Sequence, residues 1–263
     1  VETAPIETQE VIRVDMVARR SAEIPHEVAR NWYTGCKRTF DFILALVLLA
    51  AAAPVMAICA FLVRLTSRGP GLYSQARVGL NGRVYLIFKI RTMRHNCEGD
   101  SGPKWSQAGD PRVTALGRFL RRTHLDELPQ LWNVLKGEMS LVGPRPERPE
   151  FIPTLAQAIP RYRERLNVRP GVTGLAQVQL PPDTDLNSVR RKLACDLHYA
   201  QHLGLWLDLR LLLATAGKVL GVPFRITGAV LHLPRELAIP NVKKQRDPAS
   251  PRSLELTPAL QNA

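Results

Sequence analysis

The sequence of 263 residues is long enough for one large domain or two small ones, and its hydrophobic fraction of 45% excludes a chain that is disordered throughout. The formal net charge of +13 predicts a polyanionic partner, which could be nucleic acid, an anionic membrane surface or phosphorylated small molecules. Four scattered cysteines without a C-x-x-C pair argue against a disulfide framework or a zinc site.

The first third of the chain is dominated by one apolar segment. Residues 1–35 are polar and form an N-terminal leader, whereas residues 36–68 contain an uncharged run from Phe42 to Val63 that is long enough to cross a bilayer as a helix. Pro54 lies near the middle of this run, where it would bend or break a helix. Basic residues flank both ends, which favours a cytoplasmic position for both. A re-entrant helix hairpin that turns at Pro54 and a kinked span are equally compatible with these residues.

Residues 69–233 are predicted to form one cytosolic domain with a short β-hairpin. The stretch "GLYSQARVGLNGRVYLIFKIRTM" places the turn pair Asn81 and Gly82 between two β-rich segments. On the second strand Lys89 and Arg91 alternate with apolar residues, so both cations should lie on one face. Each could equally be an ordinary solvated cation.

The remainder of the domain is predicted to be mostly helical. The predicted fold class is therefore α/β in the broad sense, of the α+β type. Apolar positions in "VTALGRFLRRTHLDE" share one face beside three arginines, which predicts a basic amphipathic helix for a lipid surface or an ordinary helix on the domain core. Further helices are expected over residues 186–202 and 203–220. Residues 234–263 are rich in proline and mixed in charge, and we interpret them as a flexible tail.

Two adjacent acids are the strongest candidates for chemistry. Asp126 and Glu127 stand just before Pro129, which predicts the first turn of a helix that ends at Gly137. An ionised carboxylate can attack phosphorus, and its neighbour can hold Mg²⁺. Acids that only complement the helix dipole are the commoner case, so the pair alone does not establish an active site.

Together these segments closely resemble the bacterial sugar transferases, which are monotopic phosphoglycosyl transferases. The resemblance lies in "KRTFDFILALVLLAAAAPVMAICAFLVRLTSRGPGLYSQARVGLNGRVYLIFKIRTM", "DPRVTALGRFLRRTHLDELPQLWNVLKGEMSLVGPRPERPEF", "RPGVTGLAQVQ" and "DLHYAQHLGLWLDLRLLL", and it extends over about residues 36–220. It departs from many relatives at Gln179 and Leu180, where they carry Asn-Gly, so the sugar is not predicted from that loop.

The resemblance implies a complete set of functional expectations. The enzyme would move a sugar 1-phosphate from a UDP-sugar to polyprenyl phosphate with Mg²⁺, release UMP, and so start surface-glycan synthesis. It would sit in the bacterial inner membrane through a hairpin broken at Pro54, with the catalytic domain facing the cytoplasm. Asp126 would be the nucleophile, and Glu127 and Asp126 together would bind the metal ion. The substrate-binding residues would be Lys89, Arg91, Arg122, Arg145, Glu147, Asp196 and Tyr199.

Three questions stay open at this level. A non-catalytic, membrane-tethered basic protein that binds nucleic acid or anionic lipid is the alternative function, although an aromatic content of only 6% argues against nucleic acid as the partner. A transferase that joins the two substrates directly, with Asp126 only as a metal ligand, is a second alternative. A homodimer is neither predicted nor excluded.

Overall fold

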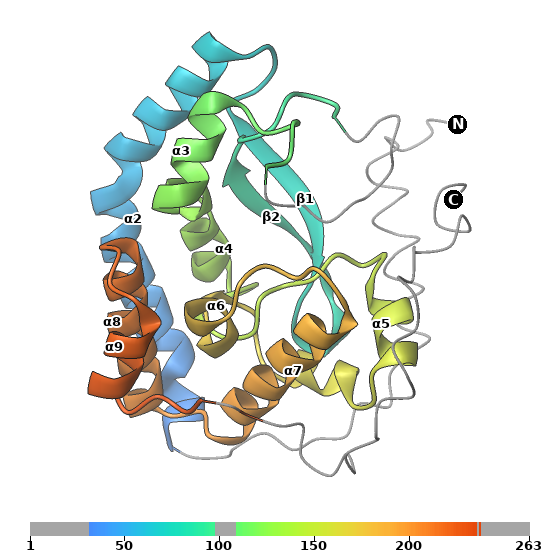
Figure 1. Ribbon diagram of the computed structural model, residues 1–263. Helices are drawn as coiled ribbons and strands as arrows, with labels where there is room; N and C mark the ends of the chain where they lie inside the picture. Colours follow the sequence, from blue (N-terminus) through green and yellow to red (C-terminus); the bar gives the residue numbers. More distant parts are fainter. Residues whose placement is uncertain (1–31, 98–108, 236, 238–263) are drawn as a thin grey trace, which may run out of the picture.

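The computed structural model describes residues 32–97, 109–235 and 237. The described chain begins with helix α2 (Trp32–Thr66) and an antiparallel hairpin of strands β1 (Leu72–Val78) and β2 (Val84–Ile90). The elements that follow are α3 (Ala115–Thr123), α4 (Gln130–Lys136), β3 (Ser140–Val142), α5 (Ile152–Ala158), β4 (Gly171–Thr173), α6 (Leu175–Gln179), α7 (Leu186–Gln201), α8 (Leu205–Val219) and α9 (Phe224–Val230). In Figure 1, α2 runs along one side of the molecule, and α3 and α4 lie between it and the hairpin.

Helix α2 carries the predicted membrane segment. It begins before the predicted boundary at residue 36 and continues as one α-helix through Pro54, so a chain reversal at this proline is not confirmed. Among the described helices, α2 alone is long and apolar enough to cross a membrane. Its middle is exposed, whereas Tyr33, Ala45 and Val63 are buried against the rest of the protein. The helix therefore contacts the domain near both of its ends.

The predicted β-hairpin is confirmed. Strands β1 and β2 pair from Leu72 with Ile90 to Val78 with Val84. Between them Asn81 and Gly82 both adopt positive φ angles, 53° and 77°, as the type I′ turn of a tight hairpin requires. The turn sequence thus fixes the register of the strand that carries Lys89.

The fold is α+β and mostly helical, as predicted. Besides the hairpin, the described residues contain one short parallel pair, β3 with β4. The main hydrophobic core forms where the first half of α2 meets β2, α4, β3, α6, α7 and α8, with Met139, Val142 and Leu211 among its most buried members. Each such side chain stabilises the fold by about 1.5–3 kcal/mol through its removal from water. The boundaries of α7 and α8 agree with the predicted helices to within about two residues.

The amphipathic helix is confirmed as α3. Leu120 is buried with Cys59, Val63 and Ile90 in a separate small cluster that joins α3 to the second half of α2 and to the end of β2. Phe119, by contrast, is exposed.

The predicted leader lies almost wholly outside the described residues, as does the predicted tail, and the domain boundaries stay predictions.

Candidate active site

The two acids lie in a separate 3-10 turn, between α3 and α4. Thr114 caps the start of α3 by accepting a hydrogen bond from the Gly117 N–H, and α3 ends at His124, whose φ of 57° turns the chain. Leu125–Glu127 then form the 3-10 turn, and Pro129 precedes α4, which ends before Gly137 as predicted. The acids therefore lie in a 3-10 turn directly before α4 instead of in its first α-helical turn. Leu128 and Pro129 between them have helical φ and ψ angles, but Pro129 has no N–H to donate to the Leu125 carbonyl oxygen.

Glu127 is held by two cations from distant segments. Its Oε1 accepts hydrogen bonds from Lys89 Nζ at 2.9 Å and from Arg145 Nη2 at 2.8 Å. Lys89 comes from β2, and Arg145 comes from the loop between β3 and α5. Burial alone would raise the pKa of Glu127, but the charges of Arg145 and Lys89 hold this pKa well below its usual range. Glu127 is thus a fixed anion that orders both cations.

Asp126 has a different environment from its neighbour. It is 7% exposed, and no hydrogen bond joins its carboxylate to any residue that the structure describes. Burial and the charge of Glu127 raise the pKa of Asp126 to about 6, against the opposing effect of Lys89, Arg121 and Arg145. A carboxylate that is desolvated, ionised at neutral pH and without a described hydrogen-bond partner is suited to act as a nucleophile.

Of the two adjacent arginines near the end of α3, Arg121 lies near the acid pair, and the predicted substrate-binding residue Arg122 does not. Arg121 is the one whose charge acts on Asp126, and its Nε donates a hydrogen bond to Thr92 Oγ1 at 2.9 Å. Arg122 is exposed, and its side chain makes no hydrogen bond or ion pair with the described part of the chain. Both lie beside the apolar face of α3, so helical periodicity alone could not distinguish them. His124 also lies near the pair, and burial lowers its pKa.

Asp196 lies beneath the Arg145 loop and not on the rim of the site. It is 3% exposed on α7, and its Oδ2 pairs with Arg165 Nη2 at 2.8 Å. The same Arg165 donates to the carbonyl oxygen of Arg145 at 2.8 Å and to the Tyr162 hydroxyl. Burial raises the pKa of Asp196 to about 6 even though Arg165 opposes this shift. Asp196 therefore supports the loop that presents Arg145.

Glu147 stands at the far end of the same loop. Its carboxylate lies 3.7 Å from Arg77 Nη1 and accepts a hydrogen bond from the Arg148 N–H at 3.0 Å. The Val78 N–H also donates to the Glu147 carbonyl oxygen, which fastens the loop to β1. These contacts place Glu147 next to the loop's attachment to the hairpin, not on the acid pair.

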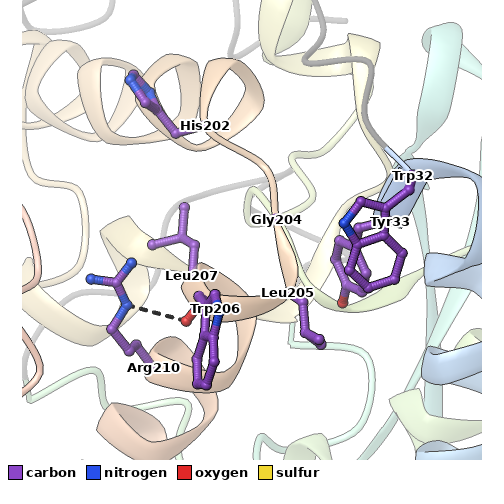
Figure 2. Close-up of a pocket in the computed structure, with 8 residues that line it drawn as sticks. All are labelled: Trp32, Tyr33, His202, Gly204, Leu205, Trp206, Leu207 and Arg210. Carbon is purple, nitrogen blue, oxygen red and sulfur yellow. Dashed lines mark hydrogen bonds between the residues drawn. The ribbon is translucent and has the colours of Figure 1, made fainter.

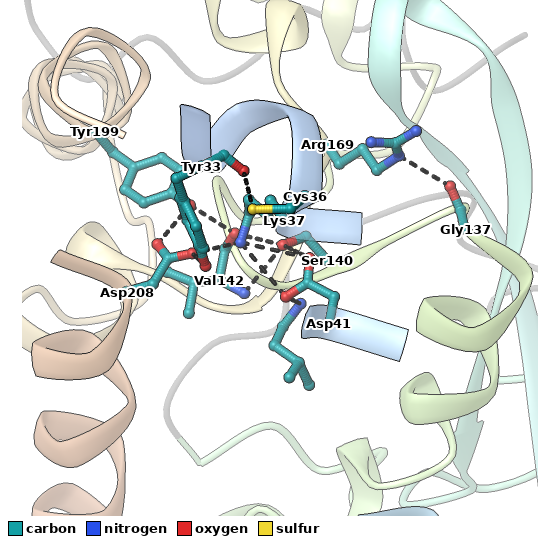
Figure 3. Close-up of polar contacts among 11 residues, drawn as sticks. Tyr33, Cys36, Lys37, Asp41, Gly137, Ser140, Val142, Arg169, Tyr199 and Asp208 are labelled. Atoms are coloured by element: carbon teal, nitrogen blue, oxygen red, sulfur yellow. Dashed lines mark hydrogen bonds and ion pairs between the residues drawn. The ribbon is translucent and has the colours of Figure 1, made fainter. Parts of the chain in front are cut away.

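Tyr199 belongs to a buried polar network (Figure 3), and its described hydrogen bonds include neither acid of the pair. Its hydroxyl lies 2.8 Å from Asp208 Oδ1 and 2.9 Å from the Val142 carbonyl oxygen. Asp208 also accepts hydrogen bonds from Tyr33 and Lys37, so the network joins α2, β3, α7 and α8. Because Tyr199 is 1% exposed, a substrate has no access to its hydroxyl in this structure.

Arg91 is also not brought to the acids. Its guanidinium group donates to the carbonyl oxygens of Ser67 and Arg68, just beyond the end of α2. A surface hollow of about 330 Å³ lies at the starts of α2 and α8 between Trp32 and Trp206 (Figure 2), and none of the predicted substrate-binding residues lines it.

The two acids are the candidate ligands for a metal ion. Within residues 32–97 and 109–235, no group of three or more His, Cys, Asp or Glu residues could hold one. Asp126 and Glu127 still offer carboxylate oxygens beyond the Oε1 that Lys89 and Arg145 occupy. Mg²⁺ is commonly held by one or two carboxylates together with waters and substrate phosphates, so this pair fits Mg²⁺ and does not form a complete protein cage.

Comparison with known proteins gives a family match over most of the described chain. Residues 32–222 match the family described as bacterial sugar transferase. A UDP-glucose:undecaprenyl-phosphate glucose-1-phosphate transferase of Caulobacter vibrioides is 45% identical over 188 residues, which cover 70% of this chain and 69% of the relative.

Two further relatives differ in length. A UDP-N-acetylgalactosamine-undecaprenyl-phosphate N-acetylgalactosaminephosphotransferase of Aeromonas hydrophila is 40% identical over 188 residues, 72% of this chain but 44% of the relative. An exopolysaccharide production protein of Rhizobium leguminosarum is 39% identical over 184 residues, 68% of this chain and 92% of the relative. The match thus covers less than half of the Aeromonas protein and most of the Rhizobium protein.

Proposed function

We propose that this chain, which belongs to the bacterial sugar transferase family, transfers a sugar 1-phosphate from a UDP-sugar to undecaprenyl phosphate, releases UMP and so initiates the synthesis of a surface polysaccharide. The observation that carries this proposal is the pairing of two unlike carboxylates. Glu127 is neutralised by Lys89 and Arg145, whereas Asp126 is buried beside them without a described hydrogen bond. The cations can bind phosphates, and the Asp126 carboxylate can attack one of them.

The charges around the acids suit a diphosphate. Three cations, Lys89, Arg121 and Arg145, lie around two anions, so the site keeps a net positive charge before any metal ion binds. Arg145 is about half exposed, which leaves its remaining donors free to bind a phosphate in two-point fashion. We therefore assign Lys89, Arg121 and Arg145 to the phosphate groups of the two substrates.

In the first step an oxygen of Asp126 attacks the β-phosphorus of the UDP-sugar. A bond forms between the carboxylate oxygen and phosphorus, and the bond between this phosphorus and the bridging oxygen breaks, so UMP leaves with the electron pair. The Asp126 carboxyl group has a pKa of about 6 and is therefore mostly ionised at neutral pH. The cations offset the negative charge that builds up on the leaving phosphate.

In the second step a phosphate oxygen of undecaprenyl phosphate attacks the same phosphorus. The bond to Asp126 breaks, the carboxylate is restored, and the sugar diphospholipid is the product. One carboxylate serves both substrates in turn, so we expect ping-pong kinetics. A Mg²⁺ ion held by Asp126, Glu127 and substrate phosphates would supply further charge neutralisation.

The packing of α2 supports a monotopic position in the membrane. Near its start α2 is held to the domain through Lys37 and Asp208, and near its end through Val63 and Leu120. A straight helix of this length would measure about 50 Å. If α2 crossed a bilayer, one of its ends would be far from a domain that stays on one side. We therefore propose that α2 enters only the cytoplasmic leaflet, through its exposed middle around Pro54, with both ends and the domain on the cytoplasmic side.

UMP release from a panel of UDP-sugars tests this function. The protein in nanodiscs with undecaprenyl phosphate and Mg²⁺ should release UMP from at least one UDP-sugar, and Asp126→Asn should abolish the release. Glu150→Gln, which changes a partly exposed acid away from the pair, should not. If no UDP-sugar yields UMP, and RNA or anionic vesicles bind with a steep salt dependence, the non-catalytic alternative is favoured instead.

A further inference from the structure

The guanidinium group of Arg91 joins the end of α2 to strand β2. Arg91 is 5% exposed. Its Nη1 donates to the Arg68 carbonyl oxygen at 2.6 Å, and its Nη2 lies 2.9 Å from both the carbonyl oxygen and the hydroxyl of Ser67. Ser67 and Arg68 are the two residues that follow Thr66, the last residue of α2. Arg91 therefore ties the segment directly after the helix to the sheet.

The backbones are in close contact at the same place. A Cβ atom at Gly71 would lie only 2.4 Å from the Ala60 carbonyl oxygen of α2, so a larger residue there would push the helix away. The Arg91 N–H donates to the Gly71 carbonyl oxygen at 2.9 Å. The neighbouring Ile90 packs against Val63 of α2. The end of α2 is therefore seated directly on β2, with little room to shift.

Residues on either side of Arg91 contact Glu127 and a cation whose charge acts on Asp126. Two residues earlier, Lys89 binds Glu127 at 2.9 Å. One residue later, the Thr92 hydroxyl accepts a hydrogen bond from Arg121, whose charge acts on Asp126. The four-residue segment from Lys89 to Thr92 thus connects the end of the membrane helix with the cations of the acid pair. A shift of this end of α2 relative to β2 would move the acids relative to the lipid surface.

We propose that Arg91 is a positioning residue that locks the end of α2 to β2 and so sets the depth of the acid pair for the phosphate group of the lipid substrate. The proposal rests on the proposed function, because it assumes one substrate that is dissolved in water and one that is anchored in the membrane. The nucleotide sugar arrives from water and needs only the local geometry of the cations. The lipid phosphate is confined to the membrane surface, so its access depends on how the membrane helix meets the site.

Kinetics of the two substrates can separate this role from direct substrate binding. Arg91→Gln removes the charge and the paired donors, Arg91→Lys keeps the charge without the fork geometry, and Ser67→Ala removes one acceptor from the other side. Arg94→Gln is the matched control, since Arg94 is an exposed arginine three positions later whose side chain makes no hydrogen bond or ion pair within the described residues. Each variant is measured in nanodiscs as full-length protein, with its melting temperature checked.

For Arg91→Gln we expect the KM for undecaprenyl phosphate to rise at least fivefold. The KM for the UDP-sugar and the UMP burst without lipid acceptor should stay within twofold of wild type. Arg91→Lys should recover part of the loss, Ser67→Ala should show a smaller change in the same direction, and Arg94→Gln none. A loss shared equally by both substrates, or an Arg91→Gln variant that behaves like Arg94→Gln, would overturn the proposal. A wild-type enzyme that turns over normally without an acceptor-free burst would instead refute the two-step mechanism, and the KM comparison would still decide the role of Arg91.

Discussion

Replacing Asp126 by asparagine should abolish activity and yet stabilise the fold. The pKa of Asp126 is about 6, against 3.8 for an ordinary aspartate, chiefly because the carboxylate is buried and lies beside Glu127. A difference of about two pH units corresponds to about 3 kcal/mol against the ionised form in the folded state at neutral pH. Asparagine carries no charge and avoids this cost, although its amide has a smaller burial cost of its own.

The sign of the effect depends on pH. Because the folded-state pKa is raised, ionisation of Asp126 destabilises the fold fully only above about pH 6. The penalty shrinks between pH 6 and 4 as the carboxyl group takes up its proton, to roughly one third of its full size by pH 4.5. The stability advantage of Asp126→Asn should therefore be largest at pH 7.5 and much smaller at pH 4.5.

Thermal unfolding in nanodiscs at these two pH values is the assay. At pH 7.5 we expect the melting temperature of Asp126→Asn to exceed that of wild type by about 2–10 °C, which corresponds to about 1–3 kcal/mol for a domain of this size. Glu150→Gln is the control, because its partly exposed pair with Arg148 contributes little. A variant less stable than wild type at pH 7.5, or an advantage that does not change with pH, would refute the assigned environment of Asp126.

Three further variants test the remaining contacts of the site and its support. Glu127→Gln removes a negative charge beside Asp126 and frees two cations, so the pKa of Asp126 should fall. In a pH–rate profile, the pH below which the residual activity is lost should therefore move downward from about 6. An upward move would contradict the assignment. Lys89→Met should lower kcat by about 100-fold and move the same midpoint upward, because the charge of Lys89 lowers the pKa of Asp126; Lys89→Arg serves as its control. Tyr199→Phe should cost about 1–2 kcal/mol of unfolding free energy through the lost bond to Asp208, with an unchanged KM for the UDP-sugar, whereas a raised KM would restore the predicted substrate contact.

The hairpin and the helices could be predicted because their signals are local. Asn81 and Gly82 specify a type I′ turn through their own backbone preferences. Apolar spacing located α3, α7 and α8 to within a few residues. Pro54 left a hairpin and a kinked span open, and the structure continues α2 through this proline as one helix, so the hairpin is not confirmed. A proline marks a weak point in a helix but does not by itself produce a chain reversal.

The acid pair could be chosen from the sequence, but most of its surroundings could not. Asp126, Glu127, Lys89 and Arg145 were all predicted, and the structure brings them together. Arg121 was missed in favour of its neighbour, because only the position of α3 against β2 decides which of two adjacent arginines turns inward.

Asp196 and Tyr199 were expected at substrate and lie in the interior. Each is engaged by a partner from another element, Arg165 in one case and Asp208 in the other. A motif shared with a family indicates that a residue matters, but it does not distinguish contact with a substrate from support of the residue that makes the contact. Only the tertiary contacts show that Asp196 acts through the Arg145 loop.

The covalent state of Asp126 is the most direct test of the mechanism. The full-length protein is mixed with a UDP-sugar and Mg²⁺ without lipid acceptor, quenched in acid within milliseconds, digested and analysed by mass spectrometry. We expect the peptide containing Asp126 to gain the mass of one sugar phosphate, and to lose it when undecaprenyl phosphate is added before the quench. Normal turnover with an unmodified Asp126 peptide at every quench time would contradict the account.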